Sequence, residues 1–178
     1  MEVKRILSAL TIIGLLLWGC TSRKAAPLTL EQLKNAEYQS EFPASKKAKL
    51  SGGEYQEQIV PGAASKLIIR LLELHAIGDL NGDGAQDAAA ILVSSSGGSG
   101  TFFDLAAVIN EKGVPKHVAS VRLGDRVKIK SVTIKSGEIV LEMVKHGPKD
   151  PLCCPTQEVS QSYKLQGDKL IETRIGEH

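Results

Sequence analysis

From Glu54 to its end, the chain is built of short apolar runs separated by turn-forming residues, and this pattern restricts its fold more than any other feature. Residues 127–135 alternate apolar and polar side chains, and Ser136-Gly137 then leads into a second alternating run, as in a β-hairpin. Similar runs predict about nine strands, at residues 54–60, 66–77, 87–93, 101–109, 117–123, 127–135, 138–145, 157–165 and 169–175. Because short turns join antiparallel neighbours, we predict a mainly β fold with a single antiparallel β-sheet domain, either a sandwich or a strongly curved sheet.

Two of these runs depart from simple alternation. KLIIRLLELHAI, residues 66–77, fits one face of a helix and also a strand that is buried on both faces. We predict a strand, because the run leads directly into a turn-rich loop and a second apolar run, 87–93, leaves that loop. In VKIKSVTIK the apolar phase shifts between Ile129 and Val132, which predicts a β-bulge near Ser131.

The stretch before the strands carries one helix signal. Thr29 and Gln32 have the spacing of a capping box, and apolar residues follow at helical intervals, so we expect a short helix near residues 30–36. Residues 43–53, PASKKAKLSGG, read as a basic loop whose lysines are solvated.

The N-terminus reads as a secretory signal. Lys4 and Arg5 precede an almost wholly apolar run, residues 6–18, that is short for a membrane span. Leu17-Trp18-Gly19-Cys20 resembles the lipobox of bacterial lipoproteins, in which the signal is cut before a cysteine that then carries the lipid. The alternative is an ordinary signal peptide with an incidental cysteine.

The lipoprotein resemblance implies three segments and a location. Residues 1–19 would be the signal peptide, 20–28 a lipid-anchored tether, and 29–178 a single β-rich domain held by acyl chains on Cys20. It places the protein in the bacterial cell envelope outside the cytoplasm. Thr21, where inner-membrane lipoproteins carry aspartate, favours the outer membrane.

Composition argues against a nucleic-acid partner. Removing Lys4, Arg5 and Glu2 with the signal lowers the formal net charge from +2 to +1, and nucleic-acid-binding domains are usually far more basic. Three phenylalanines and three tyrosines are too few for an aromatic sugar or base platform, and the single tryptophan, Trp18, lies in the signal. We therefore expect the partners to be the membrane, through the lipid, and an unknown envelope protein or component.

The stretch GDLNGDGAQD, residues 78–87, has the residue pattern in this chain that most specifically indicates a binding site. Its oxygen-bearing positions match the first nine of an EF-hand loop, D-x-[DN]-x-[DN]-G, and are supplied by Asp79, Asn81, Asp83, the carbonyl of Ala85, and Asp87. Calcium prefers six to eight such hard oxygen ligands. Position twelve, however, is Ala90 where an EF-hand has glutamate, and a strand-like run follows instead of a helix.

The loop therefore resembles the strand-flanked calcium loops of integrin-type FG-GAP repeats, D-x-N-x-D-G-x-x-D. That resemblance implies that Asp79, Asn81, Asp83, Asp87 and the Ala85 carbonyl bind Ca²⁺, with a structural role for the ion. The alternative is an acidic hairpin turn, since Asn-Gly and Asp-Gly are both strong turn dipeptides. A plain turn does not need a third carboxylate at Asp87, and three nearby negative charges repel unless a cation neutralises them.

Cys153 and Cys154 are adjacent, so they cannot staple separate parts of a fold. Three interpretations stay open: two small residues packed in a proline-bounded loop, a vicinal disulfide that stiffens the loop, or a soft-metal or redox site that uses His146. The C-x-x-C spacing of thioredoxin-like proteins is absent.

No spacing indicates a catalytic site. The four histidines, at 75, 117, 146 and 178, form no metal-ligand motif, and SSSGGSG does not have the order of a nucleophile elbow. Asp125 and Arg126 read as a turn with a local ion pair.

At larger scale, GDLNGDGAQDAAAILV, GGSGTFFDLAAVIN, LGDRVKIKSV and HGPKDPLCCPT resemble, in this order, predicted bacterial lipoproteins of unassigned function. The resemblance implies one domain and no particular activity. We expect a non-enzymatic, lipid-anchored envelope protein with a calcium-stabilised β domain that serves as a binding or structural module. The alternatives are a thiol- or metal-handling lipoprotein that uses Cys153 and Cys154, and an envelope hydrolase with a metal-dependent site.

Overall fold

A computed structural model describes residues 25–62 and 64–177, and these form eleven strands and one short helix. The elements are α1 (Leu30–Lys34), β1 (Glu37–Gln39), β2 (Lys47–Lys49), β3 (Glu54–Gln58), β4 (Lys66–Gly78), β5 (Asp87–Ser95), β6 (Phe102–Glu111), β7 (Val114–Asp125), β8 (Lys128–Lys135), β9 (Glu138–Lys145), β10 (Gln157–Gln166) and β11 (Lys169–Glu177). Every strand pair is antiparallel, which confirms the mainly β prediction. Across these residues no helix combines the length and apolar composition that crossing a bilayer requires.

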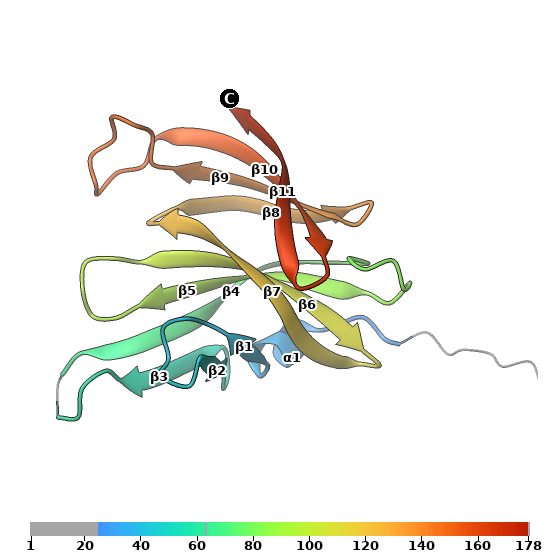
Figure 1. Cartoon of the computed structure of the whole chain (residues 1–178), viewed down its shortest axis with the longest axis horizontal. Helices are drawn as coiled ribbons and strands as arrows, with labels where there is room; N and C mark the ends of the chain where they lie inside the picture. Colours follow the sequence, from blue (N-terminus) through green and yellow to red (C-terminus); the bar gives the residue numbers. More distant parts are fainter. Residues whose placement is uncertain (1–24, 63, 178) are drawn as a thin grey trace, which may run out of the picture.

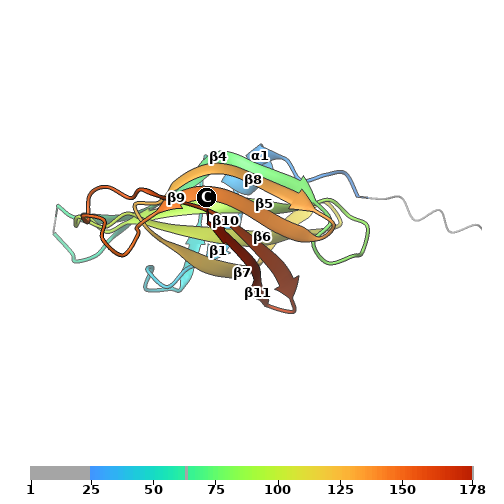
Figure 2. The ribbon, with the colours of Figure 1, turned by 90° about the horizontal axis from the view of Figure 1, so that it is seen from above.

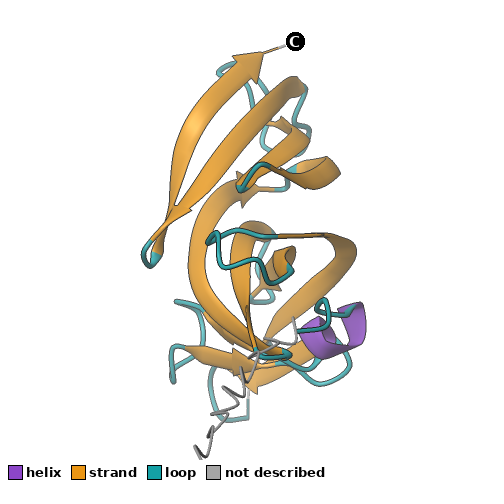
Figure 3. Cartoon of the chain, turned by 90° about the vertical axis from the view of Figure 1, so that its right-hand side faces the viewer, coloured by secondary structure: helices purple, strands orange, loops and turns teal. Residues whose placement is uncertain are grey.

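The strands form two main sheets and a small hairpin. One sheet has the order β3-β4-β5-β6-β7, the other β11-β10-β9-β8, and β1 pairs with β2 alone. The four-stranded sheet lies over the five-stranded one, which curls strongly around its core (Figures 1 and 3). Seen from above, β8 and β9 run in directions similar to those of β4, β5 and β6, whereas β11 crosses them (Figure 2). The fold thus combines the two predicted forms, a sandwich and a curved sheet.

The central strands of the five-stranded sheet, β5 and β6, are buried on both faces over most of their length. In β5, Ala89 and Ile91 face the four-stranded sheet, whereas Ala88, Ala90 and Leu92 face α1 and the β1–β2 hairpin. A strand covered on both sides cannot alternate apolar with polar residues, because both faces must leave water. This explains the continuous apolar run of residues 87–93.

The strand prediction for KLIIRLLELHAI is also confirmed, and β4 shows why its pattern is ambiguous. Leu67, Ile69 and Leu71 pack toward α1, whereas Leu72 and Leu74 pack toward the other sheet. The register between β4 and β5 is irregular between Leu71 and His75. The bulge predicted near Ser131 is confirmed too, since the β8–β9 register shifts between Ile129 and Ser131.

The structure corrects one prediction for the N-terminal part of the domain. The helix is shorter than expected but has the predicted capping box between Thr29 and Gln32. Residues 43–53 are not simply a solvated loop, because Lys47–Lys49 pairs with Glu37–Gln39 and buries Ala48 completely. The flanking lysines are engaged: Lys47 pairs with Glu37 at 2.9 Å, and Lys49 Nζ donates to the Asn35 carbonyl at 2.7 Å.

Candidate functional site

The aspartate loop, residues 79–86, joins the paired strands β4 and β5 at the end of the domain where the described chain begins (Figure 1). Strands flank it on both sides, as predicted, and no helix adjoins it within the described residues. Gly82 and Gly84 adopt φ values of 80° and 82°, a conformation that glycine tolerates far better than other residues. The two glycines therefore let the loop fold back on itself.

Side-chain oxygens of the loop accept backbone N–H groups from the same loop. The Asp79 carboxylate accepts from Gly82 at 2.7 Å and from Gly84 at 2.8 Å. Asn81 Oδ1 accepts from Asp83 N at 3.0 Å, and Asp83 Oδ1 accepts from Ala85 N at 2.7 Å. Such local bonds are the usual way in which aspartate and asparagine stabilise a turn. They bring Asp79, Asn81 and Asp83 into one small loop.

Asp87 differs from the other acidic residues of the loop. It is fully buried, and its two carboxylate oxygens accept the backbone N–H groups of Leu80 and Asn110, each at 2.9 Å. Burial raises the pKa of Asp87, and the charges of Asp83 and Asp79 raise it further, against the lowering effect of the two N–H groups. Asp87 therefore fixes the loop to the sheet while it carries an electrostatic cost.

Asn110 is a site residue that the sequence reasoning missed. Its Nδ2 donates to the carbonyls of Ala26 at 2.8 Å and Gln86 at 3.1 Å, and its Oδ1 accepts from Gly113 at 2.7 Å. The side chain thus joins the aspartate loop to the segment predicted as a tether. The end of that segment is not loose, because Leu28 is only 3% exposed. Cys20 lies outside the described residues.

The donor chemistry of the loop suits a hard cation. Asp79, Asn81, Asp83 and the Ala85 carbonyl offer only oxygen ligands, and a carboxylate oxygen that accepts one N–H retains a second lone pair. Among the described residues, however, no three His, Cys, Asp or Glu side chains converge closely enough to hold a metal ion. Among the predicted ligands, Asp87 has a clear structural role, because both of its carboxylate oxygens already accept backbone N–H groups.

At the opposite end of the domain, Cys153 and Cys154 form a disulfide in the loop between β9 and β10. Asp150 shapes this loop, since its carboxylate accepts the N–H of Gly147 at 2.9 Å and both the N–H and the hydroxyl of Thr156 at 2.7 Å. The Gly147 N–H is the main cause that lowers the pKa of Asp150. Of the three interpretations of the paired cysteines, the structure has the vicinal disulfide.

Arg126 fastens the disulfide loop to a second loop. Its pairing with Asp125, at 2.7 Å, fits the local ion pair predicted there, and its φ of 52° fits a turn. In addition, its guanidinium donates to the Leu152 carbonyl at 2.8 Å and to the Ser99 carbonyl. Ser99 belongs to SSSGGSG, so one side chain connects three loops that are far apart in the sequence.

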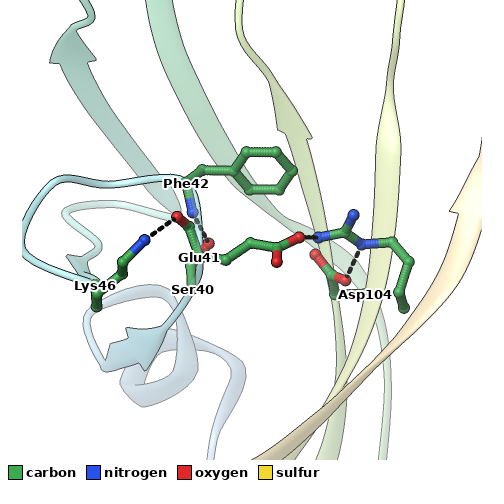
Figure 4. Close-up of polar contacts among 6 residues, drawn as sticks. Ser40, Glu41, Phe42, Lys46 and Asp104 are labelled. Carbon is green, nitrogen blue, oxygen red and sulfur yellow. Dashed lines mark hydrogen bonds and ion pairs between the residues drawn. The ribbon is translucent and has the colours of Figure 1, made fainter.

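A polar hollow of about 580 Å³ opens beside the β1–β2 connection. Arg122 lies at its wall, where it pairs with Asp104 at 2.6 Å and with Glu41. Figure 4 shows the carboxylates of Glu41 and Asp104 directed toward the same guanidinium, with Phe42 beside them. The guanidinium carbon lies 4.9 Å from the centre of the Phe42 ring and 5.2 Å from that of Phe102. This cluster fastens the β1–β2 connection to the sheet.

His117 and Ser120 also line the hollow, 2.8 Å apart, but their arrangement does not suit a nucleophile and its base. His117 Nδ1 accepts the backbone N–H of Gln39 at 3.1 Å, so its proton lies on Nε2 and is donated to the serine hydroxyl. A base must instead accept the hydroxyl proton. Burial also lowers the pKa of His117 to about 4, which keeps the ring neutral near pH 7.

His146 lies at the start of the disulfide loop, and its Nε2 is buried without a hydrogen-bond partner. The metal-site alternative at Cys153 and Cys154 gains no support, because the two sulfur atoms bond to each other. Comparisons of the chain with family models, with curated proteins and with solved structures found no match.

Proposed function

We propose that this protein is a lipid-anchored cell-envelope protein whose β domain is stabilised by calcium at the aspartate loop, and that it acts as a non-enzymatic binding or structural module. One observation carries the calcium part of the proposal. Hydrogen bonds within the loop bring the side-chain oxygens of Asp79, Asn81 and Asp83 together above Asp87. Burial is the main cause that raises the pKa of Asp87, and the charges of Asp83 and Asp79 raise it further. A cation at Asp79, Asn81, Asp83 and the Ala85 carbonyl would offset that repulsion.

The cation would act on stability and not on a reaction. The three side chains belong to an exposed loop, whereas Asp87 lies beneath it and connects it to Leu80 and Asn110. Binding to the folded chain alone raises the free energy of unfolding by about 2.7 kcal/mol when the ligand is at one hundred times its Kd. We therefore expect calcium to strengthen the junction of the loop with β5, β6 and the Ala26 segment.

Thermal unfolding in calcium and in chelator tests this part, with circular dichroism as the readout. The midpoint of the wild-type chain should rise with the logarithm of calcium concentration once the site is saturated. Asp83→Ala should lose this dependence, whereas Asp168→Ala, which removes an exposed turn aspartate, should keep it. Equal midpoints in calcium and chelator for the wild type would contradict the site.

Lipid anchoring rests on the N-terminal sequence and has its own test. Cells that express the full chain are fed an alkyne-bearing palmitate analogue, and the label on the protein is measured after fractionation of the membranes. The wild-type chain should be labelled and sediment with outer membranes, whereas Cys20→Ser should lack the label. A labelled Cys20→Ser variant would contradict the anchor.

Two observations support a binding or structural role over hydrolysis. The His117–Ser120 pair has the donor and acceptor directions reversed for nucleophile activation. The charged groups around Arg122 are paired with one another and fasten the β1–β2 connection. The partner would be an envelope protein or component. The disulfide favours a second role, in thiol chemistry, at the other end of the domain.

A further inference from the structure

We propose that Cys153–Cys154 is a thiol–disulfide exchange site, and that its reaction partner is a protein carrying a reduced dithiol that docks on Leu152. The proposal rests on the second role named above, in thiol chemistry, and on neither anchoring nor calcium binding. A disulfide stabilises a fold by closing a loop in the unfolded chain, and its effect grows with the number of residues enclosed. These cysteines are neighbours, with a sequence separation of 1, so the bond encloses no loop of that kind.

The bond is also placed where another molecule can reach it. Both cysteines are exposed, as are Pro151 and Leu152 before them. Exchange requires a thiolate to approach a sulfur atom directly, so exposed disulfides are the reactive ones and buried disulfides are resistant. Exposure together with the lack of a stabilising role indicates a chemical use for the bond.

The loop holds the disulfide in place through contacts that do not involve sulfur. On one side, the Asp150 carboxylate holds the N–H groups of Gly147 and Thr156. On the other side, Pro155 is buried. Arg126 donates to the carbonyl of Leu152, immediately before the first cysteine. Reduction of the disulfide should therefore leave the conformation of the loop unchanged and both thiols exposed.

The reaction proceeds in two balanced steps. A thiolate of the partner attacks the sulfur of one cysteine, the Cys153–Cys154 bond breaks, and the released thiolate takes up a proton. The second thiol of the partner loses its proton and attacks the partner's own sulfur in the mixed disulfide, so the second cysteine of the chain leaves as a thiolate and takes up a proton. The chain leaves with two thiols and the partner with a disulfide, so two electrons pass from the partner to the chain.

Leu152 provides the docking contact. It is 82% exposed, against 63% for Val114, 56% for Val60 and 49% for Ile59. A large apolar side chain next to a reactive group gains free energy when a partner covers it, in addition to any bond that forms. A dithiol protein with an apolar surface beside its cysteines fits this site, whereas a small thiol would gain nothing from Leu152.

The test uses the full chain and reads the two cysteines separately from Cys20. Cleavage after Lys149 and Lys164 releases one peptide that contains Cys153 and Cys154 but not Cys20. The chain is treated with dithiothreitol or with reduced thioredoxin, quenched in acid, alkylated and digested. Mass spectrometry then counts the alkyl groups on that peptide over time. Leu152→Ser is compared with Val114→Ser, a matched change at the other end of the domain.

We expect no alkyl groups before treatment and two after either dithiol, with circular dichroism unchanged. Leu152→Ser should slow reduction by thioredoxin about tenfold and leave reduction by dithiothreitol unchanged, and Val114→Ser should affect neither. A peptide with two alkyl groups before treatment would overturn the proposal, as would a disulfide that reacts only after the chain is unfolded. Equal thioredoxin rates for the wild type and Leu152→Ser would overturn the docking role.

Discussion

Replacing Asp87 tests whether the aspartate loop is held by its buried carboxylate. Asp87→Ala removes the acceptor of two buried N–H groups, those of Leu80 and Asn110. Each buried N–H left without a partner costs about 1–3 kcal/mol, so the free energy of unfolding should fall by about 2–6 kcal/mol. Asp87→Asn keeps one acceptor oxygen and turns an NH₂ group toward the other N–H, so its loss should be about 1–3 kcal/mol.

Urea unfolding followed by circular dichroism, in chelator, measures these losses without any contribution from calcium. For a domain of this size, each kcal/mol also lowers the thermal midpoint by about 2–4 °C. Asp168→Asn is the matched control, because it makes the same chemical change in an exposed turn and should stay within about 0.5 kcal/mol of the wild type. If Asp87→Ala also stays within that range, the carboxylate does not hold the loop.

The direction of the pH dependence gives a second check on Asp87. Its pKa is raised in the folded chain, so the folded state binds that proton more tightly than the unfolded state. The ionised carboxylate therefore destabilises the folded state above the raised pKa, and this cost disappears as the pH falls through it. In chelator, the wild type should gain stability relative to Asp87→Asn on acidification from neutral pH. A difference that is constant with pH would refute the electrostatic reasoning.

Three further changes test the packing, a buried histidine and the helix cap. Gly78→Ala should destabilise the domain by about 1–3 kcal/mol in urea unfolding, because the new Cβ would lie 2.6 Å from Ile134, whereas Gly98→Ala, with open space around it, should be nearly neutral. The pKa of His117 is lowered to about 4, so wild-type stability should fall as the pH drops from 6.5 toward 4, by up to about 1.4 kcal/mol per pH unit. His117→Gln should lack this fall, and identical pH profiles would contradict it. Thr29→Ala removes the acceptor of the capping box and should cost about 1 kcal/mol, measured as a lower urea midpoint.

The long strands were predictable because their signals are local. Alternation, turn dipeptides and the phase shift near Ser131 can each be read within about ten residues, and the structure has the strands and the bulge where those signals lie. The apolar run that forms β4 is harder to predict, because its own pattern fits both a helix and a strand. Only the neighbouring segments of the chain favour the strand.

The short strands β1 and β2 could not be predicted for the opposite reason. Each has three residues, and Lys47–Lys49 consists of two lysines around Ala48. Nothing local shows that Ala48 is buried, because its burial depends on packing against Tyr38 and the five-stranded sheet. Contacts between distant segments produce this hairpin, and alternation over three residues carries little information.

The residues of the candidate site also fall into two groups, those that the sequence predicts and those that only the fold shows. The loop residues Asp79, Asn81 and Asp83 stood out because their spacing is a local motif. Asn110 and Arg126 did not, because their partners lie up to 84 residues away in the sequence. A lone asparagine in a turn or an arginine beside an aspartate has an ordinary local explanation, and only the fold shows that each joins several loops.

The bond from Asn110 to the Ala26 carbonyl sets how far the domain could stand from a membrane. Ala26 lies six positions beyond Cys20 in the sequence, and six residues extend at most about 20 Å. With a lipid on Cys20, the aspartate loop would therefore stay close to the headgroups, where a negatively charged bilayer concentrates calcium. The disulfide lies at the opposite end of the long strands from the aspartate loop. A strand of 13 residues, the length of β4, spans about 40 Å, so the two sites are about that far apart. If Cys20 carries a lipid, a partner dithiol would therefore react at the end of the domain opposite to the lipid-anchored end.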